Sequence, residues 1–236
     1  MALPKINELP RYELTIPSSK QQVSFRPFLV KEQKTLLIAL ESQDESQILR
    51  AVVDTIGSCV YEPIKLETLA TFDVEYVFTM IRSKSVGENA NVNLKCTECE
   101  EFTEVVIPLE DIRIEIPEET PTVKLNDNYT IELKYPQYKA LQKELNSSDP
   151  DTMTDAMIDM IILCLDKLRT EDELINFANE TKENTITFIE SLNTQQFEDL
   201  INFVQSLPKL KHDVLFKCDH CDKDNKVLLQ GLQDFF

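Results

Sequence analysis

The chain opens with two short runs in which apolar and polar residues alternate. The first covers residues 12–16 and the second residues 23–28, and the polar segment around Pro17 between them favours a turn. Successive side chains of a β-strand point to opposite faces of a sheet, so alternation of this kind predicts strands. Together the two runs predict an N-terminal β-hairpin.

Apolar residues at helical spacing dominate two later parts of the chain. Before residue 90 the spacing predicts helices at about residues 31–42, 44–60 and 67–83. After residue 136 it predicts a helical block, with helices at about residues 150–168, 183–192 and 194–206. Ser148-Asp149-Pro150 predicts the start of this block's first helix, because it combines an N-cap with proline at the first helical position. Two further strands are expected at residues 111–116 and 128–135.

Strand-like alternation also flanks two C-x-x-C segments, Cys96-Thr97-Glu98-Cys99 and Cys218-Asp219-His220-Cys221. The flanking runs are residues 91–95, 102–109, 212–217 and 226–229. Two residues between a pair of thiols allow both sulfurs to face one point, as in the ligand spacing of zinc sites. Each segment is therefore predicted to form a knuckle at the tip of a hairpin.

The two knuckles supply four thiolates, from Cys96, Cys99, Cys218 and Cys221. Four thiolates make the closed tetrahedral set of a structural Zn²⁺ site, and we expect one zinc ion per chain. The protein would fill every coordination position, so the site is expected to hold structure and to do no chemistry. Fe²⁺ fits four thiolates as well, and only cellular availability favours zinc. His220 could replace one thiolate, although we expect it to be a loop residue.

The wide separation of the two knuckles constrains this interpretation. Residues 100–217 lie between them, whereas compact ribbons separate their cysteine pairs by about 15–20 residues. A zinc ribbon therefore requires that a large insertion interrupts it. The alternatives are two disulfides or four free thiols. Disulfides need an oxidising compartment, and residues 1–5 lack the apolar core of a signal peptide, so the metal site is favoured.

These patterns predict an α+β fold with three parts. Residues 1–90 are expected to form an N-terminal hairpin and helical domain. Residues 91–135 and 208–236 are expected to form a zinc-ribbon-like β module with extra strands, split by a mostly helical insert of residues 136–207. Cys59 and Cys164 fall on apolar helical stripes, which indicates that both thiols are buried in the core.

Composition argues against several classes of function. The 236 residues include only three glycines, which excludes a glycine-rich phosphate loop. Nucleophilic catalysis by a cysteine would need a base, and His212 and His220 are the only histidines. A metalloenzyme is a further disfavoured alternative, in which Asp73 and Glu75 or the acids at residues 110–119 would act as acid/base groups. Asp73 and Glu75 are two residues apart on a predicted helix and so do not face one point, and acids in charge runs are usually solvated. We therefore expect no enzyme activity and no small-molecule substrate. The strongest apolar run, residues 157–165, is too short to span a membrane.

The net charge of −18 is unevenly distributed. Residues 1–90 hold 10 Lys/Arg against 12 Asp/Glu, whereas residues 91–236 hold 14 against 30. Nucleic-acid binding requires a basic face that replaces the phosphate counterions, so we expect no nucleic-acid partner. A zinc-ribbon nucleic-acid-binding or transcription-related protein is the disfavoured alternative. The acidic half is either a solvated surface or a docking surface for a basic protein.

The N-terminal third carries a series of short sequence phrases in a characteristic order. They are Leu3-Pro4-Lys5-Ile6-Asn7, Tyr12-Glu13-Leu14, Phe25-Arg26-Pro27-Phe28-Leu29-Val30-Lys31-Glu32, Ala39-Leu40-Glu41-Ser42, Phe72-Asp73-Val74-Glu75-Tyr76 and Arg82-Ser83-Lys84-Ser85-Val86-Gly87-Glu88. In this order they resemble the baseplate hub assembly proteins of T4-type contractile-tailed bacteriophages. The C-x-x-C at residues 96–99 follows where such proteins often carry one. The resemblance covers roughly residues 3–88 and says little about residues 110–210.

The resemblance implies a late phage protein, structural or chaperone, that acts in building the central hub of the tail baseplate. It implies no enzyme activity, and its partners would be other baseplate hub or tail proteins. It places the protein in the host cytoplasm during assembly. Whether the protein then stays in the virion tail baseplate or leaves as a chaperone remains open.

Phe25, Arg26, Phe28 and Lys31 belong to the near-neutral part of the chain, which makes them candidates for a protein contact. On this interpretation, charge reversal of Arg26 and Lys31 would weaken recovery of hub proteins and leave thermal unfolding unchanged. Alternatively, Arg26 pairs with Glu32 or another nearby helix carboxylate. The sequence leaves both interpretations open.

Overall fold

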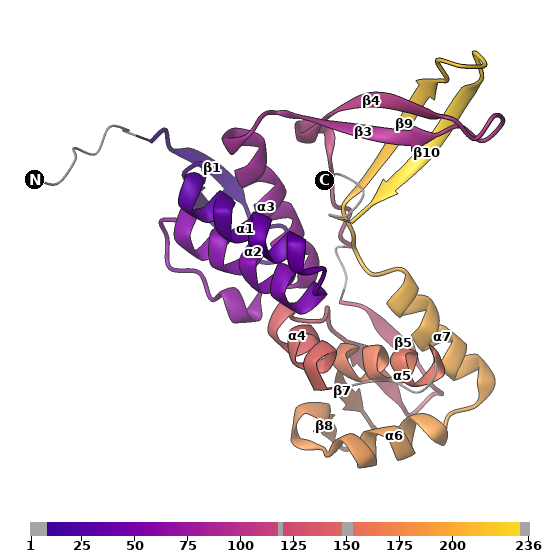
Figure 1. The fold of residues 1–236 in the computed structure, drawn as a ribbon. Coiled ribbons are helices and arrows are strands. Elements are labelled where there is room, and N and C mark those ends of the chain that lie inside the picture. The colour runs from indigo at the N-terminus through magenta and orange to yellow at the C-terminus, as the bar shows by residue number, and fades with distance from the viewer. Residues whose placement is uncertain (1–8, 118–119, 148–152, 232–236) are drawn as a thin grey trace, which may run out of the picture. The chain divides into compact units, whose positions relative to one another are not determined.

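A computed structural model describes residues 9–117, 120–147 and 153–231 of the protein. Within these ranges the fold is mixed α+β, with seven α-helices and small antiparallel sheets (Figure 1). The chain divides into two compact units. The first comprises Met1–Leu66, Phe72–Glu115 and Lys209–Phe236, and the second comprises Glu67–Thr71 and Ile116–Pro208. The first unit is therefore assembled from both ends of the chain.

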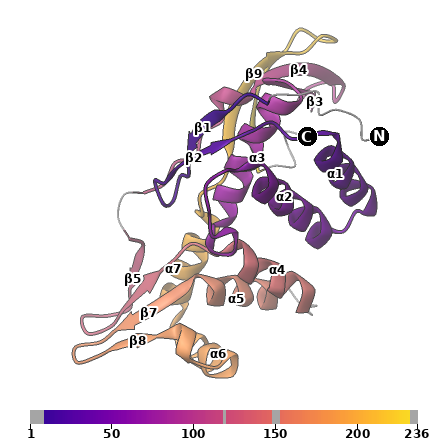
Figure 2. The ribbon, with the colours of Figure 1, turned by 90° about the vertical axis from the view of Figure 1, so that its left-hand side faces the viewer.

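The first unit begins with the predicted hairpin. Strands β1 (Tyr12–Thr15) and β2 (Gln22–Phe25) pair antiparallel, with Tyr12 opposite Phe25. Three helices follow, α1 (Val30–Ser42), α2 (Glu45–Cys59) and α3 (Thr71–Ser85), which lie side by side in both ribbon views (Figures 1 and 2). Their buried side chains include Val52, Ile56, Cys59, Phe72, Val77 and Ile81. The helical spacing of these positions in the sequence places them on inward faces.

Two longer hairpins complete the first unit. Strand β3 (Asn89–Lys95) pairs with β4 (Phe102–Pro108), and β9 (Lys211–Lys217) pairs with β10 (Asp224–Gln230). The alternation of each strand buries one face of each hairpin. These faces share a core cluster of Ala90, Leu94, Ile107, Leu109, Ile112, Leu210, Val214, Phe216 and Leu229. The tips of both hairpins lie on the same side in Figure 1, and each tip carries one C-x-x-C segment.

The second unit has its own sheet and its own core. Its four antiparallel strands are arranged in the order β5 (Thr122–Lys124), β6 (Thr130–Leu133), β7 (Leu165–Arg169) and β8 (Leu174–Asn176). Its helices are α4 (Tyr138–Ser147), α5 (Met153–Cys164), α6 (Lys182–Glu190) and α7 (Thr194–Gln205). The shared core includes Val123, Ile131, Leu133, Ile161, Leu165, Leu168, Ile189 and Leu200. Residues 122–133, grouped above with the knuckle hairpins, contribute two strands to this sheet.

The structure corrects the helix predicted at residues 150–168. Helix α5 ends at Cys164, and the next residue begins strand β7, which pairs with both β6 and β8. Ile161, Cys164, Leu165 and Leu168 satisfy helical spacing, so local periodicity alone does not reveal the change. Backbone pairing with two neighbouring strands decides the conformation, and that pairing is not local. The predicted N-cap Ser148-Asp149-Pro150 lies outside the described residues.

The prediction of a strand at residues 111–116 is also wrong. A short 3₁₀ turn, η2, covers Leu109–Asp111, and Arg113 makes only an isolated bridge to Lys211. This segment's apolar residues Leu109 and Ile112 are buried in the hairpin core. Leu109 and Ile112 are three residues apart, so they lie on one side of a helical turn, whereas in a strand they would point to opposite faces.

Candidate metal centre

The two knuckles have the same backbone conformation. In the first, the Cys96 N–H donates to the Glu101 carbonyl at 2.9 Å and the Glu100 N–H donates to the Cys96 carbonyl at 3.2 Å. In the second, the Cys218 N–H donates to the Lys223 carbonyl at 2.9 Å and the Asp222 N–H donates to the Cys218 carbonyl at 3.0 Å. Each turn thus orients its cysteines through backbone bonds within the hairpin tip.

Side chains repeat this correspondence. Glu100 and Asp222 occupy the same place in the two turns, and each has a φ of 61°. Each carboxylate also forms an ion pair, at 2.8 Å, with the lysine that precedes its knuckle. Glu100 pairs with Lys95, and Asp222 pairs with Lys217. These pairs are exposed and contribute little stability, but they show that the two hairpins are structural equivalents.

The four sulfur atoms lie at one place. All of them lie within 4.8 Å of one another, and the Sγ–Sγ distances are 3.7 Å for Cys96–Cys221 and 3.6 Å for Cys99–Cys218. A disulfide would need about 2.05 Å. A tetrahedral zinc ion with Zn–S bonds of about 2.3 Å separates its sulfurs by about 3.8 Å. The arrangement of the four predicted residues therefore fits a tetrahedral metal ion, with each close pair joining one knuckle to the other.

Backbone N–H groups prepare one thiolate in each knuckle. N–H groups of Cys99 and Glu98 donate to the Cys96 sulfur and lower the pKa of its thiol to about 6. Burial opposes ionisation of Cys218, yet the N–H groups of His220 and Cys221 lower its pKa. Both thiols therefore ionise more readily than an ordinary cysteine, which favours binding of a cation.

The second cysteine of each knuckle behaves in the opposite way. The Glu101 N–H favours the thiolate of Cys99, but burial and the three neighbouring sulfurs raise its pKa to about 12. The pKa of Cys221 is likewise raised, against the effect of the Lys223 N–H, by partial desolvation of its sulfur and by the sulfurs of Cys96 and Cys218. Four sulfurs this close cannot all ionise unless a cation lies among them.

Exposure divides the cluster into an inner and an outer pair. Cys96 and Cys218 are buried, Cys99 is half-buried and Cys221 is exposed. The outer pair gives solvent and chelators access to the sulfurs. His220 is also exposed, and its contact with the cluster is the backbone N–H bond to Cys218 at 3.4 Å. Among the described residues, the candidate ligand group consists of the four cysteines alone.

The remaining cysteines lie elsewhere. Cys59 and Cys164 are buried, and burial raises their thiol pKa values to about 11 and about 12. Both agree with the expected core positions. The carboxyl of Asp73 accepts hydrogen bonds from the backbone N–H and the hydroxyl of Ser18, so it anchors the β1–β2 turn.

Sequence reasoning missed two residues that contact the knuckles, Thr103 and Asn225. Both are polar yet buried at 4% exposure, on strands whose inward positions are otherwise mostly apolar. Each stands seven residues after the first cysteine of its own hairpin, which was the available signal. Their contacts are described below.

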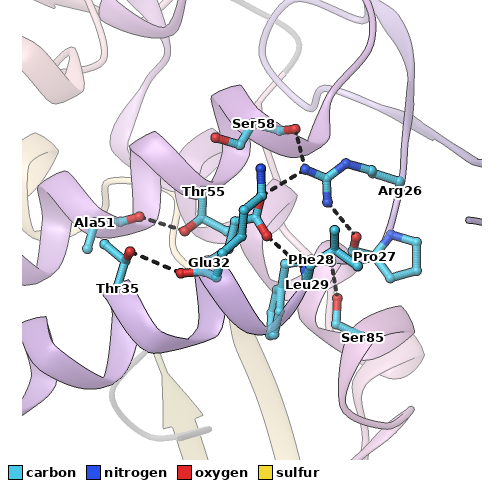
Figure 3. A network of polar contacts seen from close by, with 11 residues as sticks. Arg26, Pro27, Phe28, Leu29, Glu32, Thr35, Ala51, Thr55, Ser58 and Ser85 are labelled. Atoms are coloured by element: carbon cyan, nitrogen blue, oxygen red, sulfur yellow. Dashed lines mark hydrogen bonds and ion pairs between the residues drawn. The ribbon is translucent and has the colours of Figure 1, made fainter. Parts of the chain in front are cut away.

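The structure decides between the two interpretations of Arg26. Its guanidinium donates to the Glu32 carboxylate and the Ser58 carbonyl at 2.8 Å, and to the Pro27 carbonyl at 2.9 Å (Figure 3). The side chains of Arg26 and Glu32 are 12% and 6% exposed, whereas Lys31 is 70% exposed. Arg26 is therefore an internal ion-pair partner and Phe25 is buried. Phe28 is half-buried, and Lys31 remains a candidate for outward contact although its ammonium also pairs with Glu32 at 3.2 Å.

The fold and the cysteine cluster together define a class of protein: mixed α+β, with two equivalent hairpins whose tips bring four thiols together. No described helix has the length and apolar character that crossing a bilayer requires. The chain belongs to the T4 bacteriophage base plate protein family, whose match covers residues 9–236, nearly its full length. This confirms the resemblance to T4-type baseplate proteins. Searches of curated proteins and of solved structures found no match.

Proposed function

We propose that this protein is a non-enzymatic structural or chaperone component in assembly of the central hub of a phage tail baseplate. The family match over residues 9–236 carries the proposal, because baseplate proteins act through contacts with other proteins. The sequence phrases at residues 3–88 point more narrowly to the hub. Partners would be other baseplate hub or tail proteins, met in the host cytoplasm during assembly and retained, for a structural component, in the virion tail baseplate.

A structural zinc ion forms the second part of the proposal, with Cys96, Cys99, Cys218 and Cys221 as its ligands. The sulfur distances fit a tetrahedral ion, and four protein ligands leave no open coordination position. The ion would supply a crosslink between the two hairpins. It would neutralise the charge of four adjacent thiolates and thereby stabilise the fold.

Charge disfavours the alternative of a nucleic-acid-binding zinc ribbon. Glu98, Glu100, Glu101 and Glu104 surround the first knuckle, and all four are exposed. Only Glu100 and Glu104 among them have a described side-chain partner, Lys95 and Asn91 respectively. A surface of this sign repels phosphates.

Purification from infected cells tests the assembly role. A tagged chain expressed during infection should recover baseplate hub or tail proteins, and a tagged chain of similar charge from an unrelated protein serves as the control. Binding of the purified chain to DNA and RNA is measured in parallel across salt concentrations. Recovery of nucleic acid with a steep salt dependence, and no tail proteins, would replace the proposal with the alternative.

A further inference from the structure

Asn225 reaches from its own hairpin to the knuckle of the other one. It lies on β10 and is buried, at 4% exposure. Its Oδ1 accepts from the Thr97 N–H at 3.0 Å and from the Thr97 hydroxyl at 2.9 Å. Its Nδ2 donates to the Cys96 sulfur at 3.5 Å and to the Lys223 carbonyl at 2.9 Å. The side-chain amide thus uses both its acceptor and its donor capacity within the two knuckles.

Thr103 occupies the equivalent place on the first hairpin. It lies on β4, is also 4% exposed, and its hydroxyl accepts from the Asp219 N–H at 3.2 Å. Asp219 follows Cys218 as Thr97 follows Cys96. Each hairpin therefore binds the backbone of the opposite knuckle through the side chain at the same position. The arrangement is reciprocal, and it spans residues more than a hundred positions apart.

We propose that Asn225 and Thr103 are positioning residues of the metal centre. Each fixes the opposite knuckle so that its two sulfurs face the sulfurs of the other hairpin. The proposal rests on the metal site proposed above and adds residues outside its ligand set. Hydrogen bonds to ligands orient them and tune their basicity, and removing such a partner typically lowers metal affinity by about 10- to 100-fold.

The two residues are not equal. Asn225 makes two bonds to Thr97 and one to a ligand sulfur, whereas Thr103 makes a single described bond, to Asp219. Donation by Nδ2 also stabilises negative charge on the Cys96 sulfur. Loss of the Asn225 amide should therefore weaken metal binding more than loss of the Thr103 hydroxyl.

The test compares three variants of the full chain. Asn225→Leu removes both functions of the amide at similar volume. Asn225→Asp keeps an acceptor for Thr97 but replaces the donor to Cys96 with a carboxylate oxygen. Thr103→Val removes one hydroxyl and keeps the shape. The control is Ile107→Val, which removes a methyl group from the hairpin core without touching a knuckle bond.

Two readouts follow the metal directly. One is the affinity for Zn²⁺ in competition with a chromogenic chelator, and the other is the visible spectrum of the Co²⁺-loaded chain, which reports ligand geometry. We expect a loss of affinity of about 10- to 100-fold for both Asn225 variants and a smaller loss for Thr103→Val, with altered Co²⁺ spectra. Ile107→Val should match the wild type in both readouts, although its unfolding midpoint falls.

Three outcomes would overturn the inference. Asn225 variants whose metal affinity equals that of Ile107→Val at equal stability would show that the contacts are only structural. An unchanged Asn225→Asp would remove the role of the bond to sulfur. If Asn225→Leu fails to fold, the metal affinities of Asn225→Asp and Thr103→Val are compared with that of Ile107→Val instead. A wild-type chain that takes up neither Zn²⁺ nor Co²⁺ overturns the metal centre itself, so the two failures are distinguishable.

Discussion

At the scale of single residues, the Arg26–Glu32 pair shows how position changes the meaning of a charge. Both residues belong to a phrase that resembles phage hub proteins, and the sequence allowed an outward contact for Arg26. The structure instead surrounds the guanidinium with one carboxylate and two carbonyls. Burial raises the pKa of Glu32, but hydrogen bonds from Arg26 and the Leu29 N–H lower it overall, so the pair is charged at neutral pH.

Charge reversal distinguishes the internal role of Arg26 from an outward role of Lys31. Arg26→Glu would place two carboxylates together in a largely buried site, and breaking a buried pair costs about 3–5 kcal/mol. Lys31→Glu also removes an ion pair to Glu32, at 3.2 Å, but Lys31 is 70% exposed, so this change should cost only about 1 kcal/mol of unfolding free energy, less than Arg26→Glu. Urea unfolding of both variants measures this difference. Equal midpoints for Arg26→Glu and the wild type would contradict the internal role, and a loss of tail-protein recovery in Lys31→Glu alone would place the docking surface near α1.

Glu62 gives a prediction on acid stability. Its carboxylate accepts from the hydroxyl and the backbone N–H of Ser24 and pairs with Arg11, and these bonds lower its pKa to about 2. A lowered folded-state pKa stabilises the fold above the unfolded value of about 4.3, and this contribution disappears as pH falls toward 2. The midpoint difference between wild type and Glu62→Gln should therefore be largest near pH 6 and shrink between pH 4 and 2. A difference that stays constant over this range would contradict the assignment.

At the scale of elements, the sequence predicts those structures that are determined by residues close together in the chain. The C-x-x-C spacing and the alternating flanks predicted two hairpin tips, because knuckle geometry is local. The change from α5 to β7 at Leu165 was missed, because Ile161, Cys164, Leu165 and Leu168 fit a helix and only pairing with β6 and β8 selects a strand. Thr103 and Asn225 were missed for a similar reason, since their partners lie on the other hairpin.

The end of α5 yields a chemical prediction. Cys164 is fully buried next to β7, and burial raises its thiol pKa to about 12, so it has almost no reactive thiolate at pH 8. Iodoacetamide should modify it at least about 100-fold more slowly in the native chain than in urea. Mass spectrometry of the alkylated peptides measures both rates, with Cys164→Ser confirming the assignment. Rapid modification of the native chain would show that the end of α5 at Cys164 is open to solvent.

At the scale of the whole molecule, the knuckle hairpins and the second unit have different core clusters among the described residues. The hairpin core contains Leu94, Ile107 and Phe216, and the core of the second unit contains Ile131, Ile161 and Leu200. The four cysteines belong only to the first unit, where they join strands from before and after the second unit. A metal ion there would close a loop of more than a hundred residues, which removes considerable entropy from the unfolded chain.

Metal removal should therefore act on one unit. Treatment with a strong chelator, or Cys96→Ser or Cys218→Ser, should raise amide hydrogen exchange in β3, β4, β9 and β10 and leave β5–β8 protected. The matched control is Ile131→Ala, which should cost about 2–5 kcal/mol in the second core and raise exchange in β5–β8 at unchanged zinc content. Elemental analysis establishes the zinc content of each sample. Equal loss of protection in both units on chelation would mean that the metal supports the whole fold, and no change in either would mean that the hairpins stand without it.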